Sequence, residues 1–185
     1  MKKSILTVSI VIILAIILLM VFPQKKQEET KQILEMEITS SAFTNNGNIP
    51  EKYTCNGDNL NPPLKILGIP EGAQQLVLIM DDPDALPVAG KVWDHWILFN
   101  IKPISSIAEN SVPQGAVQGK NGAGNNEYQG PCPPAGAPHH YRFKLYALET
   151  SSFLLKEGAS KSEVEAAMKS HILAQAELVG LYTKP

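Results

Sequence analysis

The alternation of side chains in residues 139–148, HHYRFKLYAL, constrains the fold of this chain more than any other feature. A period of two residues indicates a β-strand with one buried face. One predicted face carries the apolar side chains of Tyr141, Phe143, Leu145 and Ala147, and the other carries His140, Arg142, Lys144 and Tyr146.

Other segments extend this pattern into a mainly β domain. Residues 74–82, QQLVLIMDD, form an apolar run that ends in two acids, which indicates a strand buried on both faces. Residues 91–101, KVWDHWILFNI, are rich in aromatic and β-branched side chains, as strands are. The segments 33–43 and 176–185 also predict strands. The sequence SKSE at Ser160 is a capping box, and apolar spacing predicts a helix that continues to Ile172.

Residues 115–138 are a long stretch rich in glycine and proline, and a loop of this length is usually functional. Charge excludes one class of partner. Five of the 16 basic and two of the 18 acidic residues precede Ile33, so the rest of the chain carries a formal charge of −5. A nucleic-acid-binding domain needs a basic stripe, so we expect no nucleic-acid partner.

The N-terminus has the composition of a membrane segment. Residues 5–22 are almost wholly apolar and follow Lys2 and Lys3, which predicts a transmembrane anchor or signal segment over residues 1–22. Residues 23–34 are a polar linker, and residues 35–185 are the folded domain. An uncleaved anchor would hold the domain outside the cytoplasm, and cleavage after export is the alternative.

Two cysteines, Cys55 and Cys132, lie in loop-like segments. Outside the cytoplasm they would form a disulfide, and as free thiols they would be small buried side chains. The sequence alone leaves both interpretations open.

Three segments carry candidate functional side chains: DDPDALP at 81–87, WDHW at 93–96 and GPCPPAGAPHHY at 130–141. Taken singly, DDPDALP is a typical acidic turn. The histidine of WDHW, taken singly, would be a structural side chain of a strand. Strand alternation predicts that His95 points away from the two tryptophans and that Asp94 points away from His95.

Together, DPDA, WDHWILFNI, GKNGAGNNEYQGPCPPAGAPHHYRFKLYAL, YTCNGDNLNPPL and AELVGLY resemble the phosphatidylethanolamine-binding protein family, in particular its bacterial Raf-kinase-inhibitor-like (YbhB/YbcL-type) branch. The resemblance covers residues 37–182. It implies a β-sandwich with a large central antiparallel sheet, a smaller second sheet and short peripheral helices near the C-terminus.

The resemblance also implies a small anion pocket at one rim. Its residues would be Asp82, His95, His139 and Tyr141, with Asp84, Trp93 and Pro134 lining or shaping it. The chain departs from the family pattern at Leu86, where proline is usual, and at Asp94, where a second histidine is common.

The chemistry of these side chains fits an anionic ligand. Imidazole edges and a tyrosine hydroxyl donate hydrogen bonds to anion oxygens, and Asp82 would act through its histidine or bind a protonated oxygen. We therefore expect a membrane-tethered protein that binds a small phosphate-type or phosphorylated ligand, not an enzyme, with no cofactor or metal. Modulation of a partner kinase or protease, and an uncharacterised hydrolase activity, are the alternatives.

Overall fold

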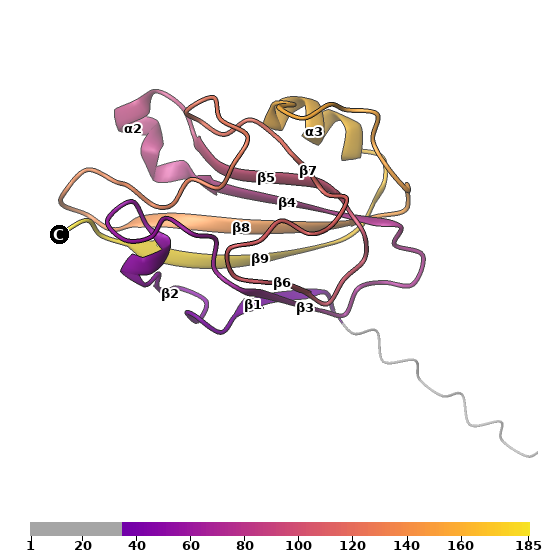
Figure 1. Cartoon of the computed structure of the whole chain (residues 1–185), viewed down its shortest axis with the longest axis horizontal. Coiled ribbons are helices and arrows are strands. Elements are labelled where there is room, and N and C mark those ends of the chain that lie inside the picture. The colour runs from indigo at the N-terminus through magenta and orange to yellow at the C-terminus, as the bar shows by residue number, and fades with distance from the viewer. Residues whose placement is uncertain (1–34) are drawn as a thin grey trace, which may run out of the picture. The chain divides into compact units, whose positions relative to one another are not determined.

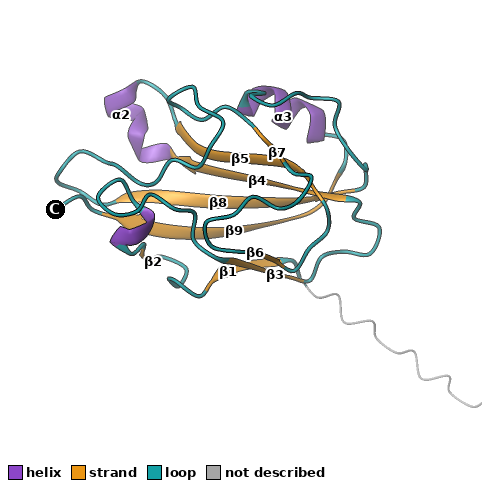
Figure 2. Cartoon of the chain, viewed as in Figure 1, coloured by secondary structure: helices purple, strands orange, loops and turns teal. Residues whose placement is uncertain are grey.

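The computed structural model describes residues 35–185, and these form two β-sheets (Figures 1 and 2). The small sheet has the strand order β1-β3-β6, with bounds Glu37–Ser40, Leu64–Leu67 and Ser106–Ile107. The large sheet has the order β2-β9-β8-β4-β5-β7, with bounds Gly47–Asn48, Ile172–Tyr182, His139–Leu148, Gln75–Asp82, Trp93–Ile101 and Val117–Gln118. The predicted mainly β sandwich is confirmed.

Strand β4 lies at the centre of the large sheet and is buried along its whole length. Its pairs with β5 and β8 are antiparallel. One face of the large sheet packs on the small sheet, and that layer contains the alternating apolar side chains of β8. The opposite face of β4 and β5 packs beneath helix α3, Lys161–Met168 (Figure 1). Burial on both faces is why the sequence of β4 lacks alternation.

Helix α3 begins at the predicted capping box. The Ser160 hydroxyl accepts from the Glu163 amide, and the Glu163 side chain accepts from the Ser160 amide. The helix ends at Met168, so its predicted continuation to Ile172 is wrong. Ile172 pairs with Leu148 of β8 and therefore begins β9. Helical spacing alone does not show that the helix ends before this point and that strand β9 begins here.

The end of β4 and the starts of β5 and β8 lie at one rim of the large sheet, because Asp82 pairs with Trp93 and Asp81 with Arg142. A 3-10 turn η2, Pro83–Ala85, and a short helix α2, Leu86–Ala89, follow β4 at this rim. Figure 1 shows α2 and the entry to β8 at the same end of the sheet. A second 3-10 turn, η1, spans Glu51–Tyr53.

The predicted membrane segment and linker lie outside the described residues, so both stay predictions. Between residues 35 and 185, every helix is too short or too polar to span a bilayer.

Candidate functional site

A β-bulge in β5 points His95 into the rim. Met80 pairs with Trp96, but the next pair is Asp81 with Asp94, so His95 is the extra residue of β5. A bulge breaks the alternation of side chains and re-aims the residue it inserts. Trp93 and His95 line the same cavity, because residues two apart in a strand share a face, so the prediction that His95 points away from both tryptophans is wrong for Trp93. Asp94 does face away from His95, as predicted, and contacts Lys161 of α3.

Asp82 ends β4 and has both carboxylate oxygens engaged. Oδ1 accepts a hydrogen bond of 3.2 Å from the Ala85 amide, which caps the η2 turn, and Oδ2 lies 2.7 Å from His139 Nδ1. The residue is only 3% exposed. Pro83 at the first position of the turn fixes the backbone that turns away from the strand. The carboxylate is therefore rigid and holds the His139 ring in one orientation.

His95 is 4% exposed and is held differently. Its Nδ1 lies 2.6 Å from the backbone oxygen of Gln129, and because a carbonyl oxygen only accepts, Nδ1 carries the hydrogen. Burial lowers the pKa of His95, although the Gln129 contact and the nearby Asp82 charge oppose that shift. The ring is thus neutral at pH 7, with the hydrogen on Nδ1 and a lone pair on Nε2.

Tyr141 lies beneath the two imidazoles. Its ring makes an edge contact with His95 at 5.1 Å between centroids and stacks with His139 at 6.5 Å. Its hydroxyl is buried without a hydrogen-bond partner among the described residues, and the residue is not part of the cavity lining. Burial, with a smaller contribution from the Asp82 charge, raises the pKa of Tyr141, so the hydroxyl keeps its hydrogen.

Asp84 does not reach the cavity. Its Oδ2 accepts from the His140 amide at 2.8 Å and lies 2.7 Å from His140 Nδ1, and the side chain is 41% exposed. Burial would raise its pKa, but the contacts with His140 outweigh burial and lower it. Asp84 therefore fixes the first residues of β8 from outside the cavity, and a ligand contact by Asp84 has no support in this arrangement.

Trp93 forms one wall, and its indole is fixed on several sides. Its Nε1 donates to Gln129 Oε1 at 2.9 Å, and the Lys91 ammonium lies 4.8 Å from the ring centroid. A Cβ placed on Gly122 would approach the indole to 2.5 Å, so only glycine lets the loop pack against this ring. Gln129 thus holds both Trp93, through its side chain, and His95, through its backbone.

Pro134, which the resemblance placed at the pocket, does lie in the cavity wall. Cys132 lines the cavity beside it, and a disulfide joins Cys132 to Cys55. The loops that carry the two cysteines lie so close that a Cβ on Gly130 would meet the Tyr53 oxygen at 2.5 Å. The disulfide leaves no free cysteine in residues 35–185, so Cys132 is not available as a nucleophile.

The resulting cavity has a volume of about 200 Å³. Most of its wall is apolar, and its polar groups converge from the ends of three strands and one loop. Its lining residues are Asp82, Ala85, Val88, Ala89, Trp93, His95, Gln129, Cys132, Pro133, Pro134 and His139. Of the predicted site residues, the structure gathers Asp82, Trp93, His95, Pro134 and His139 at the cavity and leaves Tyr141 beneath it and Asp84 outside it.

Sequence reasoning missed Gln129 and the short helix wall. Val88 and Ala89 line the cavity because α2 folds back after the η2 turn. Gln129 acts on His95 through its backbone oxygen, which every residue type has, so its identity gives no signal. Only its position in the long glycine- and proline-rich stretch hinted at a role.

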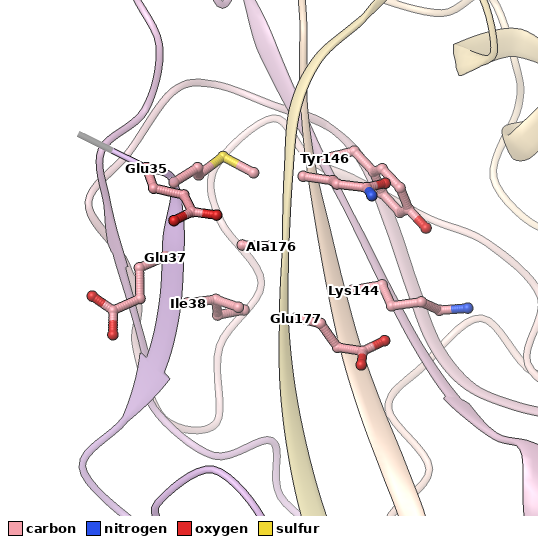
Figure 3. Close-up of a pocket in the computed structure, with 9 residues that line it drawn as sticks. Glu35, Glu37, Ile38, Lys144, Tyr146, Ala176 and Glu177 are labelled. Carbon is pink, nitrogen blue, oxygen red and sulfur yellow. The ribbon is translucent and has the colours of Figure 1, made fainter. Parts of the chain in front are cut away.

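A larger groove of about 510 Å³ lies where β1 approaches β9 (Figure 3). Figure 3 shows Glu35 and Glu37 on one side, Lys144 and Tyr146 on the other, and Glu177 of β9 between them. Lys144 is already bound to the buried Asp81 carboxylate, and no histidine lines the groove. We therefore place the candidate site at the smaller cavity, where the predicted residues meet.

A two-sheet β-sandwich with a small cavity at the rim of its large sheet is the class of domain that this fold and site define. The family model for phosphatidylethanolamine-binding protein matches residues 39–183. A UPF0098 protein from Methanothermobacter thermautotrophicus is 48% identical over 155 residues, which are 80% of this chain and 99% of that protein. The chain therefore belongs to the phosphatidylethanolamine-binding protein family.

Solved structures agree with this assignment. A putative phosphatidylethanolamine-binding protein homologue from Chlamydia trachomatis is 42% identical, with a TM-score of 0.76, and the match covers 82% of this chain and 99% of that one. YbcL of E. coli, described as a member of the mammalian PEBP family, is 30% identical with the same TM-score and the same coverage of each chain. The predicted phosphatidylethanolamine-binding protein family is thus confirmed, and the likeness to YbcL agrees with the predicted branch.

Proposed function

We propose that this protein binds a small phosphate-type anion, free or as a phosphorylated head group, in the rim cavity. The observation that carries the proposal is the convergence of Asp82, His95 and His139, each held rigidly before any ligand arrives. A binding group that is already ordered avoids about 0.5–1.5 kcal/mol of ordering cost per side chain. The cavity of about 200 Å³ limits the bound part to a small group.

Binding is better supported than catalysis. The two imidazoles and the carboxylate resemble an acid–base set, but acyl transfer also needs a nucleophile beside the base. Cys132, the one thiol of the lining, is in a disulfide. The name of the matching family model describes binding, and neither it nor the name of the UPF0098 relative specifies a reaction. A hydrolase activity has no specific observation in its favour.

We further propose that residues 1–22 tether the binding domain to a membrane. The apolar run and the lysines before it support this proposal, as does the polar linker that follows. Mass spectrometry of the mature N-terminus tests it. An intact Met1 in the membrane fraction is the expected result, and a start beyond residue 22 in the soluble fraction would contradict it. Modulation of a partner kinase or protease stays a prediction from the family resemblance.

Isothermal titration of phosphoethanolamine into the full chain, in phosphate-free buffer, tests the main proposal. We expect saturable one-to-one binding that weakens about tenfold or more in His139→Ala, which removes the ring held by Asp82. His171→Ala is the matched control, since the His171 side chain is half-exposed, pairs with Glu149 and does not line the cavity. Equal binding by all three proteins would refute the assignment of the pocket.

A further inference from the structure

The cavity lining has no lysine or arginine to neutralise an anion, and Gln129 supplies its one side-chain amide. The one charged side chain of the lining, besides the histidines, is the acid Asp82. Lys91 is nearby, but its ammonium lies over the Trp93 ring and donates to the Gly122 oxygen, and its side chain does not line the cavity. A phosphate site usually relies on such cations or on several backbone amides.

The two histidines do not supply donors in their neutral forms. Nδ1 of His95 donates to the Gln129 oxygen, and Nδ1 of His139 faces the Asp82 carboxylate. An imidazole whose hydrogen is on Nδ1 has a lone pair on Nε2. Each ring therefore presents an acceptor at Nε2 unless it gains a second proton. For His95 that gain is opposed by burial, which lowers its pKa.

The surrounding groups are mostly acids, and they determine which charge can enter the cavity. Asp82 at the end of β4 faces both rings, and Asp81 and Asp94 act on His95 from the far face of the sheet. Asp84 in η2 is engaged with His140, and Tyr141 of β8 lies beneath both rings with its hydrogen retained. The carboxylates attract a proton into the cavity but repel an anion that arrives without one.

We propose that the pocket binds its anion together with one proton, and so selects a phosphate monoester over a phosphodiester or sulfate near neutral pH. This inference rests on the proposed function. The second ionisation of a phosphate monoester lies near pH ~6, so a hydrogen on the ligand is available at little cost at pH 7. That oxygen then donates to one Nε2 lone pair, or its proton moves to the same nitrogen.

A diester and sulfate offer no such hydrogen. They require an imidazole to take a proton from solvent, and the burial of His95 disfavours that charged form. The net change is the same for every successful ligand: one proton leaves bulk water and one anion enters the cavity. The chemistry that the pocket recognises is thus a phosphate group with an ionisable hydroxyl, whether it belongs to a free phosphate or to a small phosphorylated molecule.

Titrations of the full chain with phosphoethanolamine, in two buffers with different ionisation enthalpies, measure the proton directly. We expect uptake of about one proton per complex at pH 7 and an affinity that falls about tenfold from pH 7 to pH 8. Glycerophosphoethanolamine, the matching diester, and sulfate should bind about tenfold or more weakly at pH 7. Inorganic phosphate should behave as the monoester does.

Binding of phosphoethanolamine without proton uptake, or equal affinity for the diester, would overturn this inference and leave the proposed function intact. Failure of every one of these ligands to bind would overturn both. Two variants complete the design, one as a test and one as its control. His95→Gln replaces the ring with an amide that offers either a hydrogen or a lone pair at any pH, so binding should lose at least half of its pH dependence. His171→Gln should keep all of it, since His171 lies outside the lining.

Discussion

Asp81 and Asp82 are neighbours at the end of β4, yet they serve two different regions of the molecule. Both are buried, with exposures of 0% and 3%. Asp81 faces the α3 side, where three cations converge on its carboxylate: Arg142, Lys144 and Lys161. Asp82 faces the rim cavity, where it pairs with the His139 ring and with no lysine or arginine among residues 35–185.

The difference separates a structural ion cluster from a binding site. The Asp81 carboxylate is surrounded by three donors, two from strand β8 and one from helix α3, so it has no capacity for a ligand. The cavity beside Asp82 holds no lysine or arginine, and the Nδ1 atoms of its two histidines are already engaged by the Gln129 oxygen and by Asp82. A buried carboxylate whose neighbours are already satisfied holds the fold together, whereas one whose surroundings lack donors is suited to a ligand that supplies them.

The largest effect should come from Asp81→Asn. Removing the charge leaves three cations of the cluster without their buried partner, and breaking a buried ion pair costs about 3–5 kcal/mol. Urea denaturation should show a fall in unfolding free energy of that order. Asp82→Asn is the matched control and should lose about 1–3 kcal/mol, since it breaks one charged hydrogen bond. A larger loss in Asp82→Asn than in Asp81→Asn would reverse the comparison.

Ligand affinity should show the opposite order, with the larger loss in Asp82→Asn and the smaller one in Asp81→Asn. Asp82→Asn removes the carboxylate that orients His139, so affinity for phosphoethanolamine should fall about tenfold or more. Asp81→Asn lies across the sheet and should change affinity by less than about threefold where the protein is still folded. Calorimetry on both variants decides this point. Equal losses would mean that the two faces are coupled.

Acid should act on the fold mainly through the Asp81 cluster. Burial alone would raise the pKa of Asp81, but hydrogen bonds from Lys144 and Lys161 outweigh it and lower the pKa. A lowered pKa in the folded state gives stability that is fully present above pH ~4 and is lost as the pH falls through the lowered value. Unfolding free energy measured from pH 6 down to pH 2 should therefore fall in the wild type. The fall should be shallower in Asp81→Asn, and parallel curves would contradict this role.

The smallest effect on stability should come from Tyr141→Phe. The hydroxyl has no partner among residues 35–185, so its removal should leave thermal stability unchanged or raise it by about 1 kcal/mol. Tyr182→Phe is a matched control, because its hydroxyl is also buried and unpaired. A weaker affinity for phosphoethanolamine in Tyr141→Phe alone would show that this hydroxyl turns to the ligand. A loss of stability in Tyr141→Phe would show that the hydroxyl has a partner after all.

Much of the fold was predictable because it depends on regular patterns. The alternation in β8 placed Arg142 and Lys144 on the face opposite Phe143, and the capping box gave the first residue of α3. The family motifs identified Asp82, His95 and His139 before any contact was known. These motifs consist of side chains whose chemistry is fixed by residue type.

The remaining features depend on backbone geometry that residue types do not encode. The bulge at His95 arises from the register between β4 and β5, and no local pattern in WDHW marks it. The hydrogen bond to the Gln129 backbone oxygen fixes the tautomer of His95. Every residue has a backbone oxygen, so the residue type at position 129 does not predict this contact. The end of α3 and the start of β9 depend on pairing with Leu148, far away in the sequence. The roles of Asp81 and Asp82 could not be predicted either. Alternation places the two side chains on opposite faces of the sheet but does not show which residues they contact.

Histidine ring signals in an NMR titration with phosphoethanolamine test the central claim most directly. The chain has four histidines, so each ring can be assigned and followed. The signals of His95 and His139 should move together along one binding curve, while His171, which contacts Glu149 outside the cavity, stays in place. Rings at positions 95 and 139 that do not respond while the ligand binds, or a His171 signal that moves most, would contradict a phosphate site at this rim.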